Sequence, residues 1–390
     1  MIRVREPQTL LLAGGGTGGH LFPGVAVAEA FERRVPGARA LLAVTDREAG
    51  SAHAAACPFE QVRVGSPKLP AGARHVPLFG ARMAGAVGRS LVLLRDARVC
   101  AVVGLGGYGS VAPVLAARMA GVPSVLLEQN AVPGRATRAL ARLAGATATS
   151  FEATAARGLR GRVVHTGNPL REDVLRPRAA HAEFGLEPGL PVLGVLGGSL
   201  GATGVSARVA EALPALAHAL GGASFQVLHG TGGDEAADAL RSLYAAHGIR
   251  ASVRPFFRDM AAVYGTVDVA LCRAGGTTVA ELAACGLPSL LVPYPHHADM
   301  HQRENARALV ECGAAMLLEE SDMSPAAVVA RVAPLLRDPA RRARMARAAR
   351  RVARPDAAQR VVDLLLSLLR RGTFPPAAAP AAVAREGSPA

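Results

Sequence analysis

Short apolar runs alternate with helical patterns along most of the chain. In the first half, apolar runs predict strands at 10–13, 40–44, 61–64, 101–105, 124–127 and 147–150. Apolar positions at helical spacing predict helices near 25–34, 83–98, 111–120 and 137–143. Such alternation is typical of a parallel sheet that helices cover on both faces.

The pattern restarts after residues 171–191, which are rich in proline and charge. Strands are then expected at 192–196, 225–229, 252–254, 267–271, 289–292 and 315–318, with a helix at 205–220. We therefore predict an α/β fold with two doubly wound, Rossmann-like domains that face each other across a cleft. The N-terminal domain spans 1–170, the C-terminal domain spans 171–370 with its last helix packing back on the first, and 371–390 is a disordered tail.

Composition and charge exclude several classes of protein. No apolar stretch reaches the roughly 18–20 residues that span a bilayer, and the five scattered cysteines form no C-x-x-C pair, which favours reduced thiols in the cytoplasm. With Lys68 as the only lysine, a G-x-x-x-x-G-K phosphate loop and Schiff-base chemistry are excluded.

The net charge of +14 favours an anionic partner. Scattered arginines without tryptophan argue against nucleic acid. Residues 76–98 mix apolar side chains with arginines, so this stretch either lies on an anionic membrane surface or forms an ordinary core-facing helix. Both readings stay open.

The first glycine cluster, residues 14–20 with the sequence GGGTGGH, lies between a predicted strand and a helix. Backbone N–H groups and the helix dipole at such a junction form an anion site. Gly14, Gly16 and Gly19 with Asp46 also match a dinucleotide fingerprint, which would indicate a nicotinamide-dependent oxidoreductase. That reading leaves Gly18, His20 and the second half of the chain unexplained.

Polar clusters follow other strands. Residues 104–110 (GLGGYGS), 128–130 (EQN) and 166–171 (TGNPLR) should meet at one edge of the first sheet. In the second half, residues 272–278 (CRAGGTT) open a helix whose amides suit a pyrophosphate, with Glu281 placed to accept both hydroxyls of a ribose. Gln302 and Asn305 are spaced to share one helix face and to bind a sugar's hydroxyls.

At these residues the chain resembles the MurG family of bacterial glycosyltransferases, which have the GT-B architecture. The resemblance covers roughly residues 9–350 and is carried by the motifs at 15–20, 106–108, 128–130, 167–169, 197–202 and 272–306. It implies inverting transfer of N-acetylglucosamine from UDP-N-acetylglucosamine (UDP-GlcNAc) to the C4 hydroxyl of MurNAc in lipid I. The product is lipid II for peptidoglycan synthesis, made at the inner face of the cell membrane, with no organic cofactor. The absence of a D-x-D motif between the halves fits a reaction without metal. Two alternatives stay open: a related glycosyltransferase that acts on diacylglycerol and shares much of this architecture, and a module that binds UDP-GlcNAc without turnover.

The resemblance also implies roles for individual residues. His20 is our candidate for the general base, because neutral imidazole is available near pH 7. The residues expected at the acceptor and its phosphates are Gly15, Gly16, Thr17, Gly18, Gly19, Gly106, Gly107, Tyr108, Glu128 and Gln129. Those expected at UDP-GlcNAc are Thr17, Gly18, Asn130, Arg171, Ser199, Phe257, Gly276, Thr277, Thr278, Glu281, His301, Gln302 and Asn305. Many relatives have Gln-Gln where this chain has His301-Gln302, which bears on recognition of the sugar's C4 hydroxyl.

Overall fold

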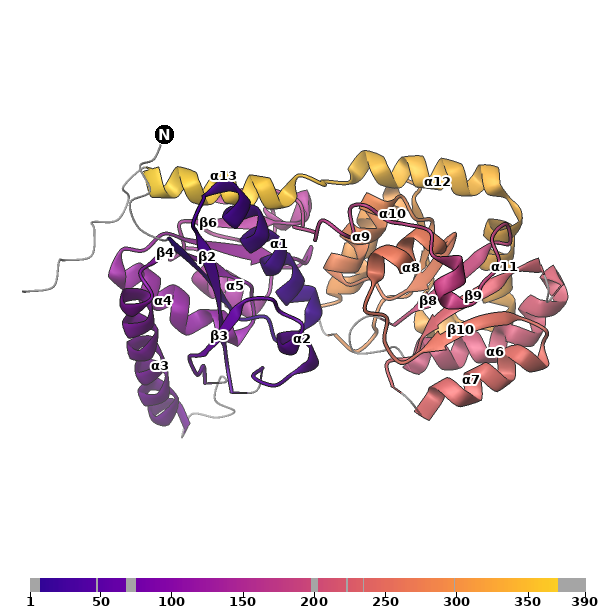
Figure 1. The fold of residues 1–390 in the computed structure, drawn as a ribbon, viewed down its shortest axis with the longest axis horizontal. Coiled ribbons are helices and arrows are strands. Elements are labelled where there is room, and N and C mark those ends of the chain that lie inside the picture. Colours follow the sequence, from indigo (N-terminus) through magenta and orange to yellow (C-terminus); the bar gives the residue numbers. More distant parts are fainter. Residues whose placement is uncertain are drawn as a thin grey trace, which may run out of the picture.

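The computed structural model describes residues 8–46, 48–67, 75–197, 203–221, 224–233, 235–297 and 299–370. The predicted tail at 371–390, Lys68 and Ser199 lie outside the described residues. Figure 1 shows two α/β bodies side by side. Their elements in chain order are β1 Thr9–Ala13, α1 Gly18–Arg34, β2 Arg39–Val44, α2 Ala52–Ala55, β3 Glu60–Arg63, α3 Val76–Asp96, β4 Val99–Gly104, α4 Val111–Ala120, β5 Ser124–Glu128, α5 Arg135–Leu140, β6 Ala146–Thr149, β7 Val163–His165, β8 Val192–Leu196, α6 Thr203–Leu220, β9 Gln226–Gly230, α7 Glu235–Ala246, β10 Arg250–Arg254, α8 Met260–Thr266, β11 Val269–Cys272, α9 Gly276–Cys285, β12 Ser289–Leu291, α10 His301–Glu311, β13 Ala315–Leu317, α11 Pro325–Arg337, α12 Pro339–Val352 and α13 Ala357–Arg370.

Each half is built on one parallel sheet. Among the described residues, the first sheet has the order β3-β2-β1-β4-β5-β6-β7 and the second has the order β10-β9-β8-β11-β12-β13. The strand order reverses beside β1 and β8, which is the switch point where doubly wound sheets bind ligands. The predicted fold class is therefore confirmed. Each predicted strand is present with its ends within two residues of the prediction, while β7 was not predicted.

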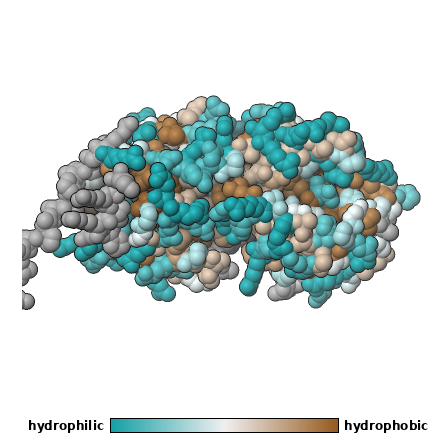
Figure 2. Space-filling model, turned by 45° about the horizontal axis from the view of Figure 1, so that its top comes forward, coloured by the Kyte–Doolittle hydropathy of each residue, from teal (hydrophilic) through white to brown (hydrophobic). Residues whose placement is uncertain are grey.

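Both faces of the sheets are buried, as the continuous apolar runs predict. In β1, Leu10 and Leu12 pack with residues of α1 and α13, whereas Leu11 packs on the opposite face with residues of α3 and α4. The second sheet is likewise enclosed between α8, α9, α10 and α12 on one face and α6, α7 and α11 on the other. Apart from these cores, hydrophilic side chains cover most of the face drawn in Figure 2, and hydrophobic ones emerge in small groups.

The chain crosses between the halves twice. It passes from β7 to the second half near Gly167, and it returns between α12 and α13, so that α13 lies along the first half (Figure 1). The two crossings touch at Gly167, whose φ is +85°, because a Cβ there would lie 2.4 Å from Cβ of Arg354. A side chain at Gly167 would therefore push the two connections apart.

Two helices begin earlier than the sequence pattern predicts. α3 starts at Val76 rather than near residue 83, and α1 starts at Gly18 rather than near residue 25. Pro23 lies inside α1 and removes the backbone N–H that would bond to the carbonyl of Gly19. The helix tolerates this proline because Gly19 finds another donor, described below.

Candidate active site

A cavity of about 1160 Å³ lies between the two halves, at the carboxyl ends of the central strands. Loops of both halves line it. From the first half come the segments after β1, β4 and β5, and from the second half the segments after β8, β9 and β11 with the start of α10. The sequence therefore correctly places most of its candidate residues around one space.

The first glycine loop lines the cavity only with its second part. Thr17, Gly18, Gly19 and His20 are in the lining, whereas Gly15 and Gly16 are not. A Cβ on Gly15 would meet the buried side chains of Leu21 and Leu105, and one on Gly16 would lie 3.0 Å from Oε1 of Glu48. These two glycines therefore lie outside the cavity lining, and their direct contact with a phosphate stays a prediction.

The first two glycine loops pack backbone against backbone. Gly14 has a φ of +93°, and a Cβ there would lie 2.7 Å from the carbonyl oxygen of Gly106. Glycine is thus required at position 14 by close approach as well as by backbone conformation. Asp46, the acid of the dinucleotide reading, is exposed and lines a different cavity, so this fingerprint does not assemble into one site.

His20 sits in the first turn of α1, facing the second glycine loop. Its Nδ1 lies 2.8 Å from Oγ1 of Thr17, which leaves Nε2 as the nitrogen without a hydrogen bond among the described contacts. Burial lowers the pKa of His20, the carboxylate of Glu128 raises it, and His301 lowers it. Burial thus favours the neutral imidazole, the form that a general base needs.

The Glu128-Gln129 pair lines the cavity, and most of its polar atoms are engaged by the protein. Both side chains are 3% exposed. The two carboxylate oxygens of Glu128 accept from the backbone N–H groups of Asn130 and Gly134, and Nε2 of Gln129 donates to the carbonyl of Leu105. Buried backbone groups thus use the carboxylate of Glu128 and Nε2 of Gln129, and the acceptor contact of the pair stays a prediction.

The start of α9 touches the start of α1 across the cleft. Oγ1 of Thr277 donates to the carbonyl of Gly19 at 2.7 Å and accepts from Nδ2 of Asn168 at 3.0 Å. The Gly19 carbonyl is the one that Pro23 leaves without its helical partner. A residue of the second half therefore completes the first turn of α1, next to His20, and the hydroxyl of Thr277 is already engaged.

Gly276 lies against the first half with no room for a side chain. A Cβ on Gly276 would lie 1.9 Å from the carbonyl oxygen of Gln129. Gly276, Thr277 and Thr278 all line the cavity, at the positive end of the α9 dipole. The arrangement of the two halves thus depends on a missing side chain at this position.

Glu281 and its neighbours form the deep part of the second-half site. Oε2 of Glu281 accepts from the hydroxyl of Tyr264 at 2.7 Å. Burial raises the pKa of Glu281 to about 7, although the Tyr264 hydroxyl and Arg171 lower it. Arg171 and Phe257, both expected at UDP-GlcNAc, line the cavity, and aromatic contacts hold each in place. The guanidinium carbon of Arg171 lies 4.7 Å from the centroid of the Phe22 ring, and the ring of Phe257 lies edge-on to that of Phe184.

The start of α10 supplies His301 and Gln302. Nδ1 of His301 lies 2.7 Å from Oδ1 of Asp299, and its ring stacks on His297 with 4.3 Å between centroids. Oε1 of Gln302 accepts from the backbone N–H groups of Ala274 and Tyr294 at 3.3 and 3.0 Å, so its Nε2 is left for a ligand.

Asn305 differs from our expectation. It is fully buried, lies outside the cavity lining, and bonds to Asn130, Ala131 and Ala274 rather than facing a sugar. The i, i+3 spacing correctly puts it one turn from Gln302, but the turn of α10 that carries it is covered by the first half.

Sequence reasoning missed several residues of the site. Tyr264 and Asp299 orient Glu281 and His301, and the carboxamide of Asn168 orients Thr277. Asn168 stands in the G-N-P motif, which was a usable signal. Nothing in the sequence near Tyr264 points to Glu281, because the two residues meet only through packing of α8 on α9.

Comparisons with known proteins agree with this geometry. Residues 10–149 match the glycosyltransferase family 28 N-terminal domain, and residues 192–361 match the glycosyltransferase family 28 C-terminal domain. A curated protein of Anaeromyxobacter dehalogenans (strain 2CP-1 / ATCC BAA-258) is 39% identical over 93% of either chain. One of Nitratidesulfovibrio vulgaris is 40% identical over 93% of this chain and 98% of its own.

Both relatives carry the name UDP-N-acetylglucosamine–N-acetylmuramyl-(pentapeptide) pyrophosphoryl-undecaprenol N-acetylglucosamine transferase. Among solved structures, Acinetobacter baumannii MurG superposes with a TM-score of 0.72 at 28% identity, covering 93% of this chain and all of that one. A likeness at 18% identity to the glycotransferase of kitacinnamycin, with a TM-score of 0.66, shows the shared fold alone. The chain belongs to the MurG family of glycosyltransferases.

Proposed function

We propose that this protein transfers N-acetylglucosamine from UDP-GlcNAc to the C4 hydroxyl of MurNAc in undecaprenyl-pyrophosphoryl-MurNAc-pentapeptide, lipid I, and so makes lipid II. The observation that carries the proposal is the meeting of two helix starts in one cavity. The start of α1 brings His20, and the start of α9 brings free amides with Glu281 one turn further on. An acceptor with a hydroxyl and a donor with a nucleoside diphosphate need such an arrangement.

The chemistry follows as a single displacement with inversion. Nε2 of His20 takes the proton of the acceptor hydroxyl while that oxygen bonds to the anomeric carbon. The bond from the anomeric carbon to the diphosphate oxygen breaks, and its electron pair leaves with UDP. Backbone amides at Gly276–Thr278 and the α9 dipole stabilise the charge that develops there.

Binding of the donor should depend on the ionisation of Glu281. An ionised carboxylate accepts hydrogen bonds from both hydroxyls of a ribose, whereas the protonated form accepts fewer. Because the pKa of Glu281 is about 7, the dissociation constant of UDP-GlcNAc should rise as the pH falls through 7. Isothermal titration calorimetry on either side of pH 7 measures this.

Two variants sharpen the measurement. Tyr264→Phe removes a hydrogen bond that lowers the pKa of Glu281, so the pH at which the affinity for UDP-GlcNAc is half lost should move to a higher value. Glu281→Gln should bind weakly with no such midpoint. If Glu281→Gln kept the pH profile of the natural protein, Glu281 would not be the group that titrates. Binding of NAD with no binding of UDP-GlcNAc would contradict the proposed function itself.

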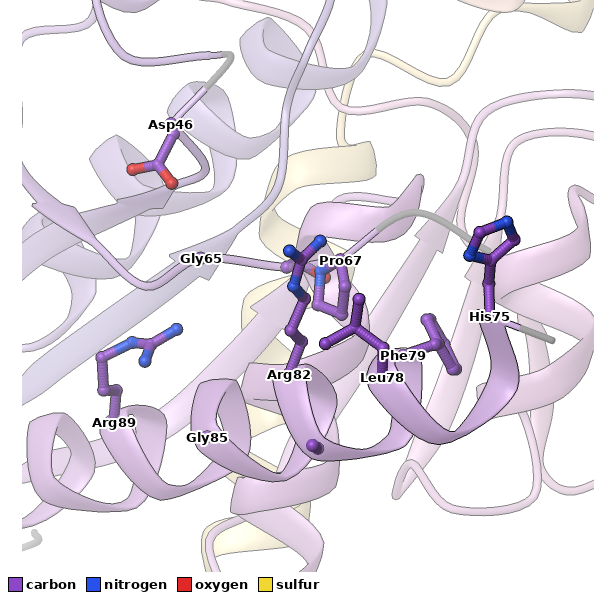
Figure 3. A pocket seen from close by; sticks show the side chains of 11 residues that line it. Asp46, Gly65, Pro67, His75, Leu78, Phe79, Arg82, Gly85 and Arg89 are labelled. Carbon is purple, nitrogen blue, oxygen red and sulfur yellow. The ribbon is translucent and has the colours of Figure 1, made fainter. Parts of the chain in front are cut away.

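We also propose that α3 lies on an anionic membrane surface. No helix in the described ranges is long and apolar enough to cross a bilayer. α3 exposes Val76 and Leu78 by about half of their surface. Figure 3 shows Arg82 and Arg89 on the side of α3 that faces Gly65 and Pro67, around a second cavity of about 740 Å³. Exposed apolar groups beside arginines suit a surface of anionic lipids, where the acceptor resides.

A sedimentation assay with vesicles tests this contact. The variant Val76→Asp/Leu78→Asp should lose most binding to vesicles that contain anionic phospholipid. Its two aspartates cannot insert among the lipids as Val76 and Leu78 would, and the anionic head groups repel them. Its affinity for UDP-GlcNAc should stay unchanged. Val352→Asp is the matched control, since Val352 is an exposed apolar residue on α12 in the second half. Equal binding by all three proteins would rule out α3 as the membrane contact.

A further inference from the structure

A relay of hydrogen bonds behind the cavity wall joins the two halves. Oδ1 of the buried Asn305 accepts from the backbone N–H of Ala131 at 2.7 Å. Its Nδ2 donates to the carbonyl of Ala274 and to Oδ1 of Asn130, each at 3.1 Å. Of these four residues, Asn130 is the one that lines the cavity.

Backbone groups dictate how the Asn305 amide is turned. A peptide N–H only donates and a peptide carbonyl only accepts, so the oxygen of Asn305 must face Ala131 and its NH2 group must face Ala274. A flipped amide would place donor against donor and acceptor against acceptor in a fully buried site. The second N–H of Asn305 is then left for Asn130, which must turn its oxygen toward it.

The other polar groups of Asn130 are also engaged. Its backbone N–H donates to Oε1 of Glu128 at 3.1 Å, and its carbonyl accepts from Oγ1 of Thr154 at 3.2 Å. Its side-chain oxygen is held by Asn305. Among the described contacts, Nδ2 of Asn130 is the group left for a ligand.

We infer that Asn305 is a positioning residue that fixes the polarity of Asn130, so that Asn130 offers the transferred sugar an N–H donor and not an acceptor. The inference rests on the proposed function. Asn130 lies beside Gly276 at the start of α9, a turn away from Glu281, so it faces the sugar end of the donor rather than its ribose. Its partner is an acceptor oxygen, either the acetamido carbonyl or a hydroxyl oxygen.

The orientation of the Gln302 amide is also set by the backbone of Ala274. The backbone N–H of Ala274 donates to Oε1 of Gln302, while its carbonyl accepts from Asn305. The backbone of Ala274 therefore sets the orientation of Gln302 directly and that of Asn130 through Asn305. Gln302 and Asn130 both present NH2 groups for a ligand. The site is thus built to bind oxygen atoms of the sugar that accept hydrogen bonds.

Asn305→Asp tests the relay. The carboxylate still accepts from Ala131, but it places an oxygen against the carbonyl of Ala274 and against Asn130, so Asn130 must turn its NH2 group away from the cavity. Calorimetry should find UDP-GlcNAc bound about tenfold more weakly or worse, with the affinity for UDP changed by less than about twofold. UDP lacks the sugar, so a merely structural role would weaken both ligands alike.

Asn130→Asp gives a second test at a partly exposed position, should the buried substitution prevent folding. It keeps the oxygen that Asn305 needs and replaces only the group that faces the cavity, so it should show the same selective loss. Glu304→Gln is the matched control. Glu304, next to Asn305 on α10, pairs with Arg157 of the first half, so its loss removes a contact between the halves without touching the relay.

Two results would overturn the inference. One is an equal loss of UDP and UDP-GlcNAc affinity in Asn305→Asp, and the other is natural affinity for UDP-GlcNAc in Asn130→Asp. A natural protein that did not bind UDP-GlcNAc at all would instead overturn the proposed function.

Discussion

Replacing His20 by alanine is expected to lower kcat about 10²- to 10⁴-fold while leaving the KM for UDP-GlcNAc within about threefold. In the proposed mechanism the imidazole meets the acceptor hydroxyl, whereas the nucleotide of the donor binds at the start of α9 and Glu281, away from His20. Loss of the base therefore slows proton removal from the acceptor hydroxyl without removing a donor contact. Steady-state kinetics with both substrates varied measures the two constants.

The pH profile of the natural protein gives a second check on the same residue. Because burial lowers the pKa of His20, kcat should fall in acid with a midpoint below that of an ordinary histidine, where the base becomes protonated. Thr17→Val removes the hydrogen bond at Nδ1 but keeps the imidazole, so it should lower kcat less than His20→Ala does. An unchanged kcat in His20→Ala would refute the assignment of the base.

Gly276→Ala is expected to lower the transfer rate about 10²-fold, because the added Cβ would force the two halves apart. That atom would lie 1.9 Å from the carbonyl oxygen of Gln129, which is part of the backbone and has no room to move alone. Separation of the halves also breaks the bond from Thr277 to Gly19 beside His20.

Gly275→Ala is the matched control for this prediction. A Cβ at Gly275 would meet Oγ1 of Thr278 at 3.7 Å, an ordinary contact, and the φ of −63° suits alanine. UDP-GlcNAc affinity by calorimetry and transfer by a coupled UDP-release assay should show that Gly275→Ala is close to natural. Equal rates for the two variants would show that the halves do not need to meet at Gly276.

Much of the fold was predictable because it depends on local pattern. Strands such as β1 and β8 are short apolar runs that are each followed by a glycine loop, a pattern typical of strands buried on both faces. The predicted start of α1, near residue 25, was wrong for an instructive reason. Pro23 argues for a helix that begins near it, but the carbonyl it leaves free is satisfied by Thr277, far along the chain.

The same difference between local pattern and contacts of distant residues applies to the site. Motifs identified which segments meet, and most of the expected residues line one cavity. They did not show which side chains have free polar atoms. Glu128 and Asn305 are polar residues beside a ligand site in sequence, yet buried backbone groups use the carboxylate of Glu128 and the amide of Asn305. For Asn305 the decisive partner, Ala131, lies in the other half, and no local spacing reveals it.

The most direct test of the central claim is a transfer assay with UDP-GlcNAc that carries a label on the sugar. The protein is incubated with lipid I, and the lipid fraction is extracted and counted, with diacylglycerol as the alternative acceptor. We predict label in the lipid fraction with lipid I, none with diacylglycerol, and strongly reduced label for His20→Ala. No label with lipid I, or label only with diacylglycerol, would contradict the proposed function.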